Sequence, residues 1–91
     1  MPNDRPIDLI DSRHMMSVLL YLLENGQCNR TSIYTNVSRN SNMPQRLDRM
    51  VDLGLLTSAV SIHGIFMDLT ERGRYIAEHL ALIERALGDL L

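Results

Sequence analysis

The chain of 91 residues has one cysteine, no tryptophan, no lysine and no long apolar run. The single cysteine, Cys28, excludes a disulfide within the chain and any cysteine-rich metal site. The longest apolar run, residues 18–23, is much shorter than the roughly 20 residues that a membrane-spanning helix needs. The N-terminal Met-Pro-Asn-Asp-Arg-Pro lacks the apolar centre of a signal peptide. We therefore expect a cytoplasmic protein with no membrane partner.

The patterns of common active sites are also missing. His14, His63 and His79 have no metal-ligand spacing among themselves or with Cys28. No Ser/His/Asp arrangement or Gly-rich phosphate loop is visible. We expect no metal, no cofactor and no enzymatic activity. Two interpretations of Cys28 stay open, a packed core thiol, which is far commoner, and a redox sensor.

Positive charge is concentrated in the middle of the chain. The net charge is −2 at pH 7, and every cation is an arginine. Between residues 30 and 49, four arginines stand against one acid, Asp48, whereas acids collect towards both ends. Because charge interactions in solution are screened within about 10 Å, this local excess matters more than the total. The middle segment can therefore attract an anionic partner.

Apolar periodicity predicts a mainly α domain with a small β-hairpin, an α+β class. Residues 1–7 contain two prolines and are expected to form an irregular arm. A helix over residues 13–24, capped by Asp8 or by Asp11 and Ser12, is apolar around most of its circumference. Such a helix must be buried on several sides.

A second, shorter helix follows a brief extended link at residues 27–29. Asn29 or Thr31 can cap this helix, because their side-chain oxygens accept hydrogen bonds from free backbone N–H groups. Ile33 and Val37 are four residues apart and are expected to face the core. A polar turn then leads into a third helix.

The third helix, residues 42–53, combines an apolar face with a polar one. Ser41 or Asn42 can cap it, and Gly54 supplies a left-handed stop. Its apolar residues recur at helical spacing: Met43, Leu47, Met50 and Val51. The opposite arc carries Asn42, Gln45, Arg46 and Arg49. Two short helices joined by a polar turn, the second with a free polar face, are typical of a helix-turn-helix unit.

After Gly54 the pattern becomes strand-like. Residues 55–69 predict a β-hairpin whose tight turn uses Gly64. Thr70 can cap a last helix over residues 70–91, and Gly73 inside it costs about 1 kcal/mol relative to alanine. We expect that glycine to allow close approach of the helix to the hairpin. An apolar seam follows the helix through Ile76, Leu80, Ile83, Leu87 and Leu90, widened by Tyr75, Leu82 and Ala86.

Three local motifs carry a family resemblance. They are Gln45-Arg46-Leu47 followed by Met50, then Leu53-Gly54-Leu55-Leu56, then Leu69-Thr70-Glu71-Arg72-Gly73-Arg74. At this spacing the chain resembles the MarR-type and HxlR-type winged-helix transcription regulators of bacteria and archaea, over roughly residues 8–91. The resemblance implies a winged helix-turn-helix domain at 8–69, with a recognition helix at 42–53 and a wing at 55–69. It further implies a C-terminal dimerisation helix at 70–91.

The resemblance also implies a set of DNA-contacting residues. Ser41, Asn42, Gln45, Arg46 and Arg49 would enter the major groove, where arginine pairs with guanine and amides pair with adenine. Arg30, Thr31 and Arg39 would lie near phosphates. The wing tip, residues 61–64, departs from the family because it has no basic residue apart from His63, which is the one DNA contact that we expect from the tip. We therefore expect the recognition helix to supply most of the contacts.

These patterns predict a sequence-specific, double-stranded DNA-binding transcription regulator that acts as a homodimer, with Tyr75, Ile76, Leu80, Ile83, Leu87 and Leu90 at the dimer interface. No effector is indicated by the sequence. The alternative is a winged-helix protein-interaction module without DNA binding. A separate interpretation of Arg46 and Arg49 is that they only solvate a surface helix and pair locally with Asp48 or Asp52. Leu53 lies on the arginine arc and is expected to pack under the hairpin. An exposed Leu53 would favour a protein partner.

Overall fold

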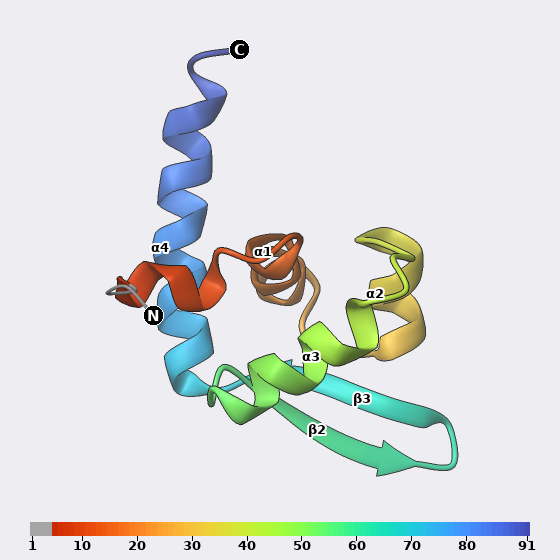
Figure 1. The fold of residues 1–91 in the computed structure, drawn as a ribbon. Coiled ribbons are helices and arrows are strands. Elements are labelled where there is room, and N and C mark those ends of the chain that lie inside the picture. The colour runs from red at the N-terminus through yellow and green to blue at the C-terminus, as the bar shows by residue number, and fades with distance from the viewer. Residues whose placement is uncertain (1–4) are drawn as a thin grey trace.

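The computed structural model describes residues 5–91 and has an α+β arrangement (Figure 1). Within this range, four α-helices and a short 3-10 helix accompany one antiparallel sheet of three strands. The elements in chain order are the 3-10 helix Pro6–Ile10, α1 Met15–Asn25, β1 Cys28–Asn29, α2 Arg30–Asn36, α3 Met43–Asp52, β2 Leu56–Ser61, β3 Gly64–Leu69 and α4 Glu71–Gly88. The expected α+β class is confirmed at this level of detail.

The N-terminal segment differs from the expected irregular arm. Residues 1–4 of that arm lie outside the described residues, and Pro6–Ile10 forms a 3-10 helix that buries Ile10. Asp8 caps this short helix, since its Oδ2 accepts a hydrogen bond from the N–H of Arg5 at 2.9 Å. Asp8 was one of the expected caps of α1, but it caps the 3-10 helix instead. Proline in the first turn favours such a start, because its missing N–H would be unpaired there anyway.

The start of α1 also differs from the expectation. The helix begins at Met15, two residues later than expected, and neither Asp11 nor Ser12 caps it with a side chain. His14 precedes it in a left-handed conformation with φ of 71°. The helix end is as expected, because Gly26 adopts a positive φ and its N–H bonds to the carbonyl of Leu22.

The sheet has the order β1-β3-β2, with β3 in the centre. The expected hairpin is confirmed: β2 and β3 pair from Leu56 with Leu69 to Ser61 with Gly64, around a two-residue tip. The expected extended link forms the third strand, since Cys28 pairs with Met67 and completes the sheet. Strand β3 of the hairpin is therefore paired on both sides, with β2 on one side and β1 on the other.

The core lies where α1, α3, α4 and the sheet meet. As the apolar pattern of the first helix predicts, Met15, Val18, Leu19 and Leu22 of α1 are buried. Ile33 of α2 is also buried, and so are Met43, Leu47 and Met50 of α3. The remaining buried apolar residues come from the N-terminal segment, the hairpin and α4: Ile10, Leu55, Leu56, Met67, Leu69, Ala77 and Leu80.

The junction between α3 and the hairpin is fixed by Gly54. This residue has φ of 79°, and its N–H bonds to the carbonyl of Val51, while the N–H of Leu55 bonds to the carbonyl of Met50. These two bonds form a Schellman motif, which closes the helix and satisfies its last carbonyls. The predicted left-handed stop is confirmed, and it sets the direction in which β2 leaves α3.

The start of α4 is tied to the same junction. Thr70 caps the helix, because its Oγ1 accepts a hydrogen bond from the N–H of Gly73 at 2.9 Å. The same hydroxyl lies 2.6 Å from the carbonyl oxygen of Gly54, to which it donates. The expected cap is confirmed, and it connects three elements through one side chain.

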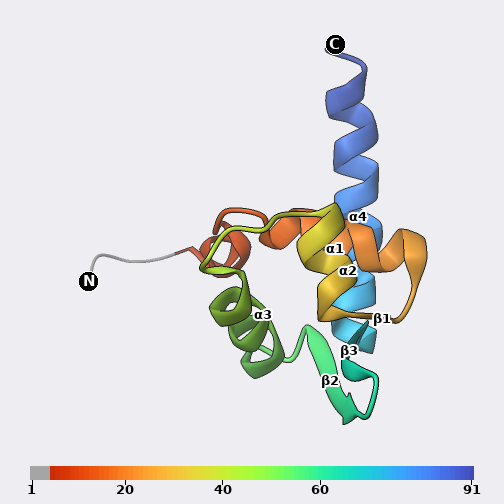
Figure 2. The same ribbon diagram turned by 90° about the vertical axis from the view of Figure 1, so that its right-hand side faces the viewer.

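The C-terminal half of α4 extends beyond the rest of the described chain in both views (Figure 1 and Figure 2). Within the expected seam, Leu80 is buried in the chain's own core and Ile76 packs against that core. Ile83, Leu87 and Leu90 are exposed, together with Tyr75 and Leu82. The expected seam is therefore divided, with its first half used inside the chain and its second half open.

Candidate nucleic-acid interface

The pair of helices α2 and α3 presents the predicted polar face. Asn29 caps α2, since its Oδ1 accepts a hydrogen bond from the N–H of Ser32 at 2.9 Å. Asn42 is the first flanking residue of α3, but its side chain makes no capping bond. The Oδ1 of Asn40 instead accepts from the N–H of Asn42 at 2.9 Å. Neither expected cap, Ser41 or Asn42, performs that role through its side chain.

Helix α3 separates an apolar face from an exposed polar face. Met43, Leu47 and Met50 are fully buried. Asn42, Gln45 and Arg49 are exposed on the opposite side, as their spacing predicts. Because the buried face anchors the helix, the backbone positions that carry these three polar side chains are fixed relative to the core.

Arg46 differs from its neighbours on α3 because it is only partly exposed. Its Nη1 atom is buried and has no hydrogen-bond partner among residues 5–91. A buried, unpaired guanidinium nitrogen costs free energy, so a group that pairs with it on binding would be favoured. Arg46 therefore stays a candidate contact, although it offers less free surface than Arg49.

Arg30 has a partner that the sequence interpretation did not assign to it. Its Nη2 lies 2.6 Å from Oδ1 of Asp48, which joins the start of α2 to the middle of α3. The Arg30 side chain is 14% exposed and that of Asp48 is 66% exposed. Burial lowers the pKa of Arg30, but the Asp48 carboxylate and the Tyr34 side chain raise it, and the net direction is upward. The ion pair therefore holds the Arg30 side chain between α2 and α3, and the phosphate contact expected of Arg30 stays a prediction.

Of the other predicted DNA contacts, Thr31 lies in the first turn of α2, and Arg39, expected near a phosphate, lies with Ser41, expected in the major groove, at the turn between α2 and α3. Thr31, Arg39 and Ser41 are exposed. A shallow hollow of about 240 Å³ is lined by Tyr34, Arg39, Asn40, Ser41 and Pro44. The structure therefore brings Arg39 and Ser41 together, with Tyr34 beside them. The interpretation of the sequence overlooked Tyr34, which stands one helical turn after Arg30.

The hairpin tip carries apolar rather than basic side chains. Val60 is 82% exposed and Ile62 is 96% exposed, and His63 is exposed beside them. The Oγ of Ser61 accepts from the N–H of His63 at 3.1 Å, which orders the turn. His63 is thus accessible at the tip, as required for the contact predicted for it.

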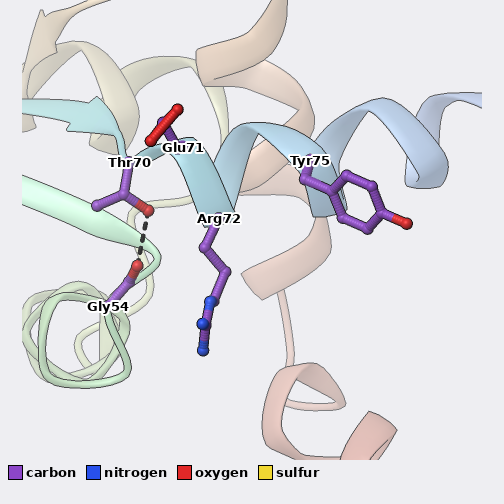
Figure 3. A pocket seen from close by; sticks show the side chains of 5 residues that line it. All are labelled: Gly54, Thr70, Glu71, Arg72 and Tyr75. Atoms are coloured by element: carbon purple, nitrogen blue, oxygen red, sulfur yellow. Dashed lines mark hydrogen bonds between the residues drawn. The ribbon is translucent and has the colours of Figure 1, made fainter.

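Leu53, which we expected to pack under the hairpin, packs against the core at the end of α3 and is not fully exposed. It is half-buried and lines an apolar cavity of about 370 Å³ between the 3-10 helix, the end of α3 and the start of α4. The other cavity-lining residues are Pro6, Ile7, Leu9, Ile10, Leu55, Arg72 and Ile76. Arg72 also borders a neighbouring open hollow with Gly54, Thr70, Glu71 and Tyr75 (Figure 3).

Cys28 lies in β1 and is partly buried. Burial raises the pKa of the Cys28 thiol, and the nearby Asp68 carboxylate raises it further. Since the thiolate is the reactive form, both effects favour the packed-thiol interpretation over the redox sensor. Across residues 5–91, His, Cys, Asp and Glu side chains form no group of three that could hold a metal ion.

None of the helices within residues 5–91 combines the length and the apolar composition that crossing a bilayer requires. No protein-family model matches this chain, and no curated protein is detectably similar to it in sequence.

Proposed function

We propose that this protein is a winged-helix, sequence-specific DNA-binding regulator that acts as a homodimer and not as an enzyme. One observation carries the proposal: α3 buries Met43, Leu47 and Met50 of its apolar face while it presents Asn42, Gln45 and Arg49 to solvent. Amide and guanidinium groups are the side chains that read base edges in the major groove. A helix anchored in this way has the form of a recognition helix.

The topology supports the same proposal. The order α1-β1-α2-α3-β2-β3 and the sheet order β1-β3-β2 are compatible with a winged-helix arrangement, in which a hairpin flanks the recognition helix. The basic and polar residues Arg39 and Ser41 lie at the turn just before α3, where phosphates of a bound duplex would pass. The local excess of arginine favours an anionic partner despite the acidic total.

The homodimer is supported by the open half of α4. Ile83, Leu87 and Leu90 are exposed in one chain, and single domains of this size rarely leave so many large apolar side chains together in water. A two-fold dimer would present two recognition helices, and joining two modest sites raises the effective affinity.

Titration of labelled duplexes at several salt concentrations tests the proposal. Phosphate contacts predict that affinity falls with salt at a log–log slope of about −0.9 per contact. Replacing Gln45 and Arg49 by alanine should remove sequence preference, whereas Arg13→Ala, an exposed arginine outside α2 and α3, should preserve it. Phosphate contacts give much tighter binding at about 50 mM salt than at physiological salt. A protein that does not bind DNA at that low salt concentration would therefore refute the proposal.

A second candidate function is a protein-interaction module. The exposed Val60 and Ile62 at the hairpin tip favour it, because apolar side chains do not attract phosphates and often mark protein contacts. If the titration shows no DNA binding, this function becomes the better account of the tip. Ile62→Ser should then reduce capture of the protein partner while leaving the fold intact.

A further inference from the structure

Helix α4 carries two apolar stripes, and the chain itself uses only one. Gly73, Ala77 and Leu80 are buried where α4 meets α1 and the hairpin. A second stripe runs along another face of the helix, and its residues are exposed. At helical spacing it contains Tyr75, His79, Leu82 and Ala86, with Ile83 and Leu90 beside them. Figure 3 shows Tyr75 projecting from this open side of α4, one turn beyond Arg72.

We propose that α4 of a second copy of this chain covers the open stripe in the antiparallel orientation. The proposal rests on the homodimer suggested above and adds its orientation and register. In the register that places Tyr75 against the partner's Ala86, a large side chain meets a small one. His79 then lies against the partner's Leu82, and two-fold symmetry repeats both contacts.

Charge selects this orientation. Glu78 and Arg85 lie on the same flank of the stripe, two helical turns apart, and both are exposed. In an antiparallel pair like flanks meet, so Glu78 lies beside the partner's Arg85 and both charges are matched. In a parallel pair the charged flank of one helix meets the apolar flank of its partner. This places Glu78 beside the partner's Ile83 and Arg85 beside the partner's Leu90. The parallel arrangement therefore pairs charges with apolar groups.

The apolar cavity beside Leu53 fits the same register. Ile76 lines that cavity and forms the second flank of the stripe, so the partner's Ile83 contacts Ile76. One turn further on, the partner's Leu87 reaches the part of the cavity next to Arg72. Ile7 and Leu9, which are half exposed in the single chain, would be covered by this contact. Each copy thus completes a cavity of the other.

Cross-linking tests the orientation in the full chain carrying Cys28→Ser, which removes the native thiol. Tyr75→Cys and Ala86→Cys proteins are mixed in equal amounts and oxidised. The antiparallel register predicts that the mixed disulfide is the main product and that each variant alone forms little. Efficient disulfides of each variant with itself, or a protein that sediments as a monomer at micromolar concentration, would overturn the proposal.

A charge exchange provides a second test that keeps Cys28 in place. Glu78→Arg should weaken dimerisation about tenfold by sedimentation equilibrium, since two symmetric pairs become repulsive. Adding Arg85→Glu should restore it, and Glu84→Arg, the same charge change outside the stripe, should have little effect. No rescue by the double exchange would contradict the register. DNA titration is independent of both tests. If mixed disulfides form but the protein does not bind DNA, only the proposed function is refuted. If the protein binds DNA as a dimer but each variant forms disulfides with itself, only this inference is refuted.

Discussion

A Cβ atom added to Gly73 would overlap the carbonyl oxygen of Leu55. The first turn of α4 therefore packs directly on the backbone that joins α3 to the hairpin, and the hydroxyl of Thr70 bonds to the same junction. The end of α3, the base of the hairpin and the start of α4 therefore meet at one junction.

Gly73→Ala should destabilise the fold although alanine is the better helix former. The propensity gain is about 1 kcal/mol, whereas an extra methyl group in a well-packed site costs about 1–3 kcal/mol. Because the added Cβ would overlap backbone, where no flexible side chain can yield, we expect the upper part of that range, about 2–3 kcal/mol. We expect a net loss of about 1–2 kcal/mol in the free energy of urea unfolding. Gly88→Ala is the matched control, because no atom lies near its added Cβ, and it should be neutral or stabilising. Equal stability of the two variants would contradict the close approach.

The ion pair between Arg30 and Asp48 should hold α2 against α3. Asp48→Asn leaves the largely buried Arg30 without its carboxylate, but the exposure of Asp48 to solvent limits the loss. We expect about 1 kcal/mol of destabilisation by urea unfolding, decreasing as salt is added. Asp52 lies on the same helix and forms no salt bridge within the described chain, so Asp52→Asn is the control. If both variants unfold alike, Arg30 does not position α3.

The sequence predicted those features that depend on neighbouring residues. The Thr70 cap, the Gly54 stop and the hairpin turn each follow from residues that are close together in the sequence, and the structure has them. The features that could not be predicted from the sequence depend on contacts between residues that are far apart along the chain. Strand β1 exists because Cys28 pairs with Met67, and the Arg30 side chain has an ion-pair partner, Asp48, that lies 18 residues further along the chain.

The apolar seam of α4 shows the same limit. Helical period identifies which residues of α4 are apolar, but it does not say which of them meet the chain's own core. Only the packing against α1 shows that Leu80 is buried while Ile83 stays in water. The predicted dimer seam was thus a mixture of two surfaces, which the three-dimensional arrangement separates.

Cys28 should make stability depend on pH in the alkaline range. Burial, with help from Asp68, raises the pKa of the thiol in the folded protein, so the native state holds this proton more tightly than the unfolded chain does. Its contribution is complete below the ordinary thiol pKa of about 9 and is lost as the pH rises through the higher folded value. Unfolding free energies measured from pH 7 to 10 should therefore fall more steeply for the native protein than for Cys28→Ser. Parallel curves would show that the thiol is not shifted.

Ile62→Arg tests whether the hairpin tip reaches DNA. Ile62 is almost fully exposed at the tip, so the substitution changes charge without disturbing the core. If the tip lies beside the duplex, the added arginine should neutralise one phosphate per subunit and steepen the log–log salt slope by about 0.9 for each. Affinity at low salt should rise several-fold, whereas Ile62→Ser, which removes the apolar group without adding charge, should leave the slope unchanged. An unaltered slope for Ile62→Arg would place the tip away from the DNA, and its apolar side chains would then be assigned to a protein contact.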